Sequence, residues 1–248
     1  MKEILLAFVM AAMVLNSCTT VKEPPPPLTD VELKALKLIG GELTPDNNIK
    51  IGDILIDRAK QELIFPGEVN MTKGGLEVLI CTGAGRRHES LLVSNVPPMK
   101  LQLALILLGA ENGARRPGGQ IPQGSIIDID VVNQDGIRVP VEKWLCNADT
   151  KTEFSRRGWV FVGSSFTSDG KCLADAEGNL VNTWVSGNTI LDNSGALDEN
   201  INQTVDKSNS SLEQYKADGG IDIFTQNVAP YLSPVKIIMK IRKQEDKK

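Results

Sequence analysis

The chain has 248 residues, of which 41% are hydrophobic and 23% are charged, and it contains 22 glycines and 13 prolines. These are ordinary values for a globular protein with many turns, and they exclude a chain that is disordered throughout. The formal net charge of −4 provides no broad basic surface, so nucleic acid is not an expected partner.

The N-terminus has the layout of a lipoprotein signal peptide. The apolar run 4–15 ends in Leu15-Asn16-Ser17-Cys18 and is shorter than the roughly 20 apolar residues that a membrane span needs. It resembles a bacterial lipobox, which implies cleavage before Cys18 and acylation of that cysteine, for example with palmitate. We therefore expect a signal peptide over residues 1–17 and a mature protein anchored on the lipid bilayer through Cys18. The alternative is a buried N-terminal helix of a cytosolic protein.

The location follows from the same resemblance. Thr19 stands after Cys18, where an aspartate often retains lipoproteins at the inner membrane of two-membrane bacteria. The expected location is therefore the cell envelope, with the periplasmic side of the outer membrane favoured in such a bacterium.

The remaining chain is expected to form a tether and one domain. Residues 18–29 contain four consecutive prolines, which favour an extended conformation and indicate a stiff tether. Residues 30–248 are expected to form a single β-rich domain of the α+β class, with a mainly antiparallel sheet. Glycine-rich residues 110–124 mark a candidate subdomain break, and residues 192–220, rich in Asn, Ser and Asp, indicate a long loop.

In chain order, the first expected element is a short helix that begins at Thr29 or Asp30. Antiparallel strands are expected over 49–56, 63–65, 76–80 and 87–93, with a hairpin turn at Gly83-Ala84-Gly85 between the last two. A helix over about 97–109 follows, opened by Pro97-Pro98 and closed by Gly109. Because it is apolar on nearly every side, this helix is predicted to be buried.

The second half reads as a series of strands. Residues 125–132 are joined to 137–139 by Asp135-Gly136, a strong hairpin signal. Further strands are expected over 141–146, 158–163, 172–174 and 180–185, and a last one over 235–241.

The candidate site residues surround the only histidine. His88 stands with Glu89 and Ser90 on one expected strand, and Glu77 lies on the preceding strand. A single histidine excludes mechanisms that need two imidazoles, and the cysteines lack the close CxxC pairs of structural zinc sites, so neither a metal nor a cofactor is expected. The catalytic candidates are thus His88, Glu89, Ser90 and Glu77. The alternative is a histidine that merely satisfies hydrogen bonds in a core or a turn.

Three cysteines remain if Cys18 carries lipid. Cys81 lies in an apolar run and reads as a small buried hydrophobe. A catalytic pair of Cys81 with His88 across the expected turn is conceivable, but a reactive thiolate needs partial exposure. The sequence leaves open whether Cys146 and Cys172 form a disulfide.

An ordered series of motifs resembles a known family. The series includes Gly67-Glu68-Val69-Asn70, His88-Glu89-Ser90-Leu91-Leu92, Pro140-Val141-Glu142-Lys143-Trp144-Leu145 and Trp159-Val160-Phe161-Val162-Gly163-Ser164. Over residues 49 to 241 the chain is similar to the YdjY-type domain of bacterial envelope proteins, many of them lipoproteins. The resemblance implies a fold and a location and carries over no activity.

Two functions therefore compete. The first is a non-enzymatic, membrane-anchored envelope module that binds a partner protein or a small ligand near the strand of His88. The second is an enzyme, or a redox or metal accessory protein, that uses a site around His88.

Overall fold

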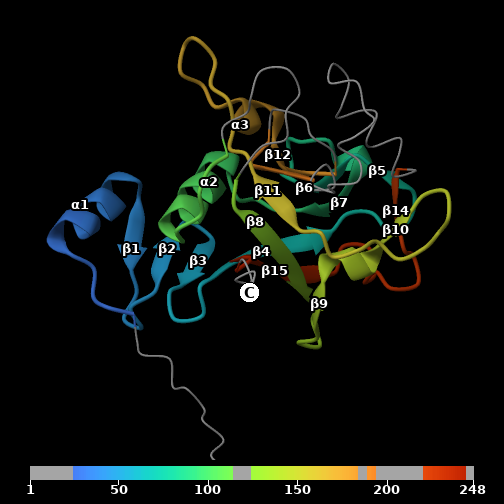
Figure 1. Cartoon of the computed structure of the whole chain (residues 1–248), viewed down its shortest axis with the longest axis horizontal. Helices are drawn as coiled ribbons and strands as arrows, with labels where there is room; N and C mark the ends of the chain where they lie inside the picture. The colour runs from blue at the N-terminus through green and yellow to red at the C-terminus, as the bar shows by residue number, and fades with distance from the viewer. Residues whose placement is uncertain (1–24, 114–123, 184–188, 194–219, 244–248) are drawn as a thin grey trace, which may run out of the picture.

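The computed structural model describes residues 25–113, 124–183, 189–193 and 220–243 (Figure 1). Within these ranges the protein is β-rich and has few helices. Eight strands form a closed barrel, because each pairs with the next and the last pairs back onto the first. In order around the barrel they are β4 (Glu62–Val69), β15 (Pro234–Ile241), β8 (Ile126–Val132), β11 (Trp159–Phe161), β13 (Leu191–Asn193), β12 (Asn179–Asn182), β6 (Val78–Cys81) and β7 (Ser90–Val93).

Side chains fill the barrel interior. On β8, Ile127, Ile129 and Val131 are fully buried, whereas the residues between them are half-exposed. This alternation places one face of the strand in the core. β15 carries the buried Ile237 and Met239 and pairs along most of its length with both β4 and β8. The expected α+β class holds only in part, because the centre of the fold is this closed barrel.

Three strands extend the sheet from the first half of β4. β3 (Ile54–Asp57) pairs with β4, and β2 (Ile49–Ile51) and β1 (Gly41–Leu43) follow in antiparallel order. Beyond them lies α1 (Asp30–Leu38), the predicted N-terminal helix. A capping box begins it, because the Glu32 backbone N–H donates to Thr29 Oγ1 (3.3 Å) and the Thr29 N–H donates to the Glu32 carboxylate (2.7 Å).

The second half is attached to β8. β9 (Arg138–Pro140) pairs with β8 across the turn at Gly136, whose φ is +78°, which confirms the predicted hairpin. The strands outside the barrel and its extensions form a small antiparallel sheet: β10 (Leu145–Asn147), β14 (Ile221–Ile223) and β5 (Gly75–Leu76).

Two of the predicted strands are wrong. Most of 141–146 forms a 3₁₀ helix, η2 (Val141–Trp144), because Pro140 at the end of β9 has no N–H to donate to a continuing strand pairing. Residues 172–174 lead into α3 (Leu173–Glu177), which ends at Gly178 in the left-handed conformation (φ +71°). Short apolar runs fit either structure, and here the flanking proline and glycine decide.

The predicted apolar helix is present as α2 (Pro98–Leu107), with proline in its first turn. Its buried side includes Leu101, Ala104 and Leu105 and packs beside β3, β12 and α3. Ile106 and Leu107, however, are 47% and 43% exposed. The prediction of a helix buried on all sides is therefore wrong in the last turn, because α2 is covered along one side only.

The predicted hairpin between β6 and β7 is also wrong. The two strands are parallel, with Val78 beside Ser90 and Cys81 beside Val93. The chain returns through residues 82–89, which end in the 3₁₀ helix η1 (Arg87–Glu89). Two apolar runs with glycines between them suggest a hairpin. The parallel pairing of β6 and β7 instead depends on the closure of the barrel by strands distant in sequence, which the residues of the two runs do not indicate.

One barrel includes strands from both sides of the candidate subdomain break, and the described cysteines are unpaired. Strands from both sides of residues 110–124 belong to the same barrel. Of the expected loop 192–220, the first two residues belong to β13, and residues 194–219 lie outside the described part, as do the signal peptide and Cys18. Cys81, Cys146 and Cys172 are all free and buried, so no disulfide joins the last two.

Candidate functional site

The loop of residues 82–89 packs closely against the junction between α3 and β12. The N–H groups of Thr82 and Arg86 donate to Gly178 O (2.6 Å) and Asn179 Oδ1 (3.4 Å). A Cβ on Gly85 would lie 2.5 Å from the Gly178 oxygen and 2.8 Å from the Cβ of Cys81. Only glycine fits at this close approach, so the loop is held against Gly178 and Asn179 at the end of β6.

The charged candidates meet at the end of this loop. Arg86 Nη1 lies 3.3 Å from the Glu77 carboxylate and 3.2 Å from that of Glu89, and His88 Nε2 lies 3.8 Å from Glu89. The His88 side chain is 80% exposed. Three of the four sequence candidates are thus brought together around Arg86, in a solvated cluster of ion pairs of the kind that contributes little to stability.

The fourth candidate lies apart from them. Ser90 is fully buried at the start of β7, beside β6. Cys81 is fully buried too, and burial raises the pKa of its thiol, which outweighs the opposite effects of the Ser90 hydroxyl and the Arg87 guanidinium. The structure therefore brings together neither a Ser–His nor a Cys–His pair, because His88 points into solvent from η1.

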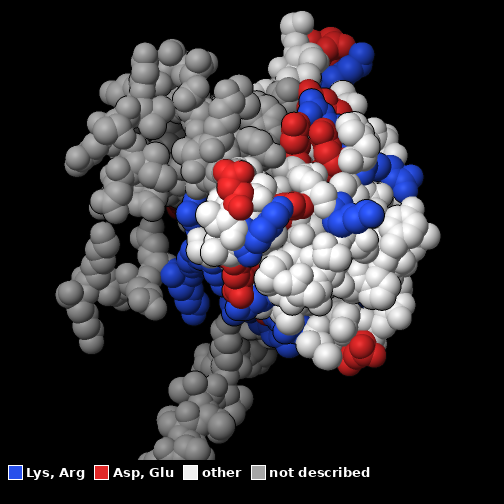
Figure 2. All heavy atoms as spheres, turned by 90° about the vertical axis from the view of Figure 1, so that its right-hand side faces the viewer, with Lys and Arg blue, Asp and Glu red and all other residues white. Residues whose placement is uncertain are grey.

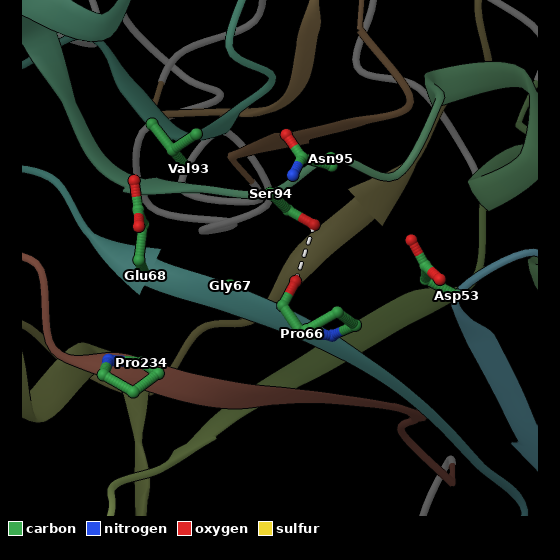
Figure 3. A pocket seen from close by; sticks show the side chains of 8 residues that line it. All are labelled: Asp53, Pro66, Gly67, Glu68, Val93, Ser94, Asn95 and Pro234. Atoms are coloured by element: carbon green, nitrogen blue, oxygen red, sulfur yellow. Dashed lines mark hydrogen bonds between the residues drawn. The ribbon is translucent and has the colours of Figure 1, made fainter.

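A notch that was not predicted from the sequence opens at the other end of β7. The edge of β4 is covered by β3 over its first residues and by β7 over its last, and the notch lies between these two pairings. Its volume is about 210 Å³. The lining residues, drawn in Figure 3, are Asp53, Pro66, Gly67, Glu68, Val93, Ser94, Asn95 and Pro234.

Hydrogen bonds and close packing fix the floor of the notch. Ser94 Oγ donates to the Pro66 carbonyl oxygen (2.7 Å), the dashed line in Figure 3, and accepts from the Val96 N–H (3.3 Å). Gly67 is closely packed, because a Cβ there would lie 2.7 Å from Ile237 Cδ1 and 3.2 Å from the Val93 oxygen, and the Ile237 side chain would have to shift. The notch is thus a preformed feature of the barrel wall.

Two carboxylates flank the notch. Figure 3 shows Asp53 on one side and Glu68 on the other, with Ser94 and Asn95 between them. Asp53 is exposed and Glu68 half-exposed, and neither carboxylate has a hydrogen bond or an ion pair within the described part of the chain. The lining includes no lysine or arginine. Such a site suits a group that donates hydrogen bonds and carries positive charge.

A family model for the YdjY domain matches residues 54–186, more than half of the chain. The chain belongs to the YdjY domain family. No curated protein and no solved structure matches it. The match covers six barrel strands, whereas β13 and β15 lie outside it, so the barrel of this YdjY domain closes only with residues beyond the matched region.

The YdjY domain also holds a buried acid that sequence reasoning missed. Glu142 in η2 is 2% exposed, and neither of its carboxylate oxygens forms a hydrogen bond. Burial raises its pKa to about 7, and nearby Asp128 adds to the rise while Arg156 opposes it. No sequence signal marks this residue as buried, since it stands beside the charged Lys143.

Ion pairs cover the outer face of β8 near this acid. Arg156 and Arg138 each pair with Asp130, at 2.9 and 2.7 Å, and Arg242 pairs with Asp128. On the side of the domain that carries β5, β10 and β14, basic and acidic side chains are likewise interspersed (Figure 2). These arrangements show no single-sign field of the kind that attracts a polyanion.

The described residues contain neither a metal-ligand cluster nor a membrane-spanning helix. No group of three or more His, Cys, Asp or Glu side chains that could hold a metal ion occurs in that part. None of its helices combines the length and the apolar character that a bilayer span needs.

Proposed function

We propose that this YdjY domain is a non-enzymatic binding module of the bacterial cell envelope, anchored to the membrane as a lipoprotein through Cys18. The support for the anchor is the lipobox-like sequence and the apolar run before it. In the proposal, residues 1–17 are removed and the β-rich domain stays close to the membrane surface, where its partner is located.

The binding site in this proposal is the notch beside β4. The observation that carries it is the pair of unpartnered carboxylates, Asp53 and Glu68, on either side of a preformed hollow. A lysine or arginine side chain of a partner protein would fit between them, and Asn95 would supply a further polar contact. A bound guanidinium would gain charge-assisted hydrogen bonds, which are about twice as strong as neutral ones.

Titration with small probes tests the notch directly. Acetyl-arginine amide and acetyl-lysine amide should bind saturably and shift the backbone amide signals of Gly67 and Asn95, whereas acetyl-aspartate amide should not. The double variant Asp53→Asn/Glu68→Gln should lose this binding. The matched control Asp135→Asn/Glu111→Gln removes two exposed carboxylates elsewhere and should retain it. Equal shifts in both double variants would refute the notch as the site.

Two cellular experiments test the rest. Incorporation of an alkyne-labelled palmitate should depend on Cys18, and a Cys18→Ala variant that is still labelled would exclude this anchor. A photo-crosslinking residue at Asn95 should capture a specific partner in intact cells, whereas the same residue at the exposed Thr150 should not. Repeated failure to capture a specific partner with the crosslinking residue at position 95 would count against the binding role.

A further inference from the structure

A second hollow lies where the described chain begins. Its volume is about 300 Å³, and it is enclosed by residues 25–28, α1, β2, β3 and the end of α2. Its walls are mostly apolar, with Leu36 from α1, Ile49 and Ile56 from the strands, and Leu107 from α2. We call this hollow the N-terminal groove.

The incoming chain is fixed to the rim of this groove. Asn47 Nδ2 donates to the carbonyl oxygen of Pro25 (3.0 Å), and Arg58 Nη2 donates to that of Pro26 (2.8 Å). Arg58 Nη1 also donates to Asn47 Oδ1 (2.8 Å), so the two side chains support each other. The chain therefore enters the domain at one defined point, and its last prolines are part of the domain surface.

Exposed apolar side chains adjoin the groove. Ile106 and Leu107 are consecutive, both more than two-fifths exposed, and they belong to the last turn of α2. Leu107 also forms part of the groove wall. Single exposed apolar residues are ordinary on protein surfaces. A pair that continues into an apolar hollow instead marks a surface that a membrane or another protein can cover.

The length of the preceding chain limits what can cover this surface. Pro25 is seven positions after Cys18, so a fully extended chain between them spans at most about 25 Å. A domain of about 200 residues has a radius of gyration of roughly 16 Å. If Cys18 is held in the bilayer, the side that carries the groove must stay near the membrane, whereas the opposite side lies beyond the reach of the chain.

We infer that the N-terminal groove and the exposed end of α2 form a membrane-docking surface that lies on the bilayer to which Cys18 is anchored. The inference rests on the lipid anchor proposed above. The apolar rim at Ile106 and Leu107 enters the boundary between headgroups and acyl chains, where it removes apolar surface from water. The anchor then holds the domain in one orientation, with the groove toward the lipid.

Fluorescence quenching by lipid tests the orientation. The full chain is expressed in bacteria, purified in its processed form and reconstituted into vesicles of phosphatidylethanolamine and phosphatidylglycerol with brominated acyl chains. A bimane label is attached in the variant Ile106→Cys. The matched control is Thr150→Cys, an exposed residue after β10, which lies at the opposite end of the molecule from α1 (Figure 1). The native cysteines 81, 146 and 172 are buried and remain unlabelled.

The expected result is a blue shift and a loss of fluorescence at position 106 and neither at position 150. Protein that floats with the vesicles but shows no quenching at position 106 overturns the docking surface and leaves the anchor intact. If the protein does not float with the vesicles, the proposed lipid anchor is wrong, and the inference that rests on it is wrong too. A blue shift at position 106 without quenching would mean that a protein, such as a second copy of the chain, covers the surface. Equal quenching at both positions would mean that the domain has no preferred orientation. Either result would overturn the inference.

Discussion

Replacement of Glu142 by glutamine should raise the free energy of unfolding relative to that of the wild type as the pH rises. The carboxyl has an ordinary pKa of 4.5 and a folded-state value of about 7, because burial disfavours its ionised form. The folded state therefore binds more protons than the unfolded state between these values, and stability is lost as the pH rises through this window. Above it, the folded protein contains an ionised and desolvated carboxylate.

The size of the effect follows from this difference in pKa. One pKa unit corresponds to about 1.4 kcal/mol, so the full cost of the ionised carboxylate is about 3 kcal/mol. Glutamine has nearly the shape of the protonated acid and does not titrate. Its buried amide also lacks a partner, which costs about 1–3 kcal/mol at every pH, so the informative quantity is the change with pH and not the absolute difference.

Urea denaturation followed by tryptophan fluorescence measures this change. Between roughly pH 5 and roughly pH 8.5, the free energy of unfolding of Glu142→Gln relative to the wild type should rise by about 2–3 kcal/mol. The control Glu111→Gln removes an exposed carboxyl and should show no such trend. A relative stability of Glu142→Gln that is the same at both pH values would refute the assignment of Glu142 as a buried, unpaired acid.

Three further predictions test the packing of the loop after β6, the role of His88 and the burial of the cysteines. Gly85→Ala should destabilise the fold by about 1–3 kcal/mol in urea denaturation, because the added Cβ would overlap neighbouring atoms. In the control Gly83→Ala, the added Cβ meets nothing within 4 Å, so its stability should stay near that of the wild type. Equal effects of the two variants would refute the close packing of the loop. His88→Ala should change stability by less than about 0.5 kcal/mol and leave probe binding at the notch intact, and a loss of binding would move the site to His88. A thiol reagent should modify no cysteine of the folded, lipidated protein and three after unfolding, whereas rapid reaction in the folded state would contradict the burial of Cys81, Cys146 and Cys172.

Local signals predicted local structure well. The capping residues before α1, the Asp135-Gly136 hairpin and the proline at the start of α2 all act within a few residues of the element they define. The YdjY family could also be predicted, because its motifs are short and follow one another in order along the chain.

Features that depend on distant partners could not be predicted. The parallel pairing of β6 with β7 follows from the closure of a barrel whose neighbouring strands are far apart in sequence. The notch is formed by residues from the β2–β3 turn, β4, the end of β7 and the start of β15, none of which is distinctive alone. The burial of Glu142 depends on the elements packed around η2, so only the folded arrangement reveals its unusual environment.

The position of β15 has a consequence for the order in which this protein can fold. Residues 234–241 are among the last that the structure describes, yet they lie between β4 and β8 and join the two halves of the barrel. During synthesis from the N-terminus, β4 and β8 have a missing neighbour until this segment arrives. The barrel therefore cannot close until nearly all of the described chain is available.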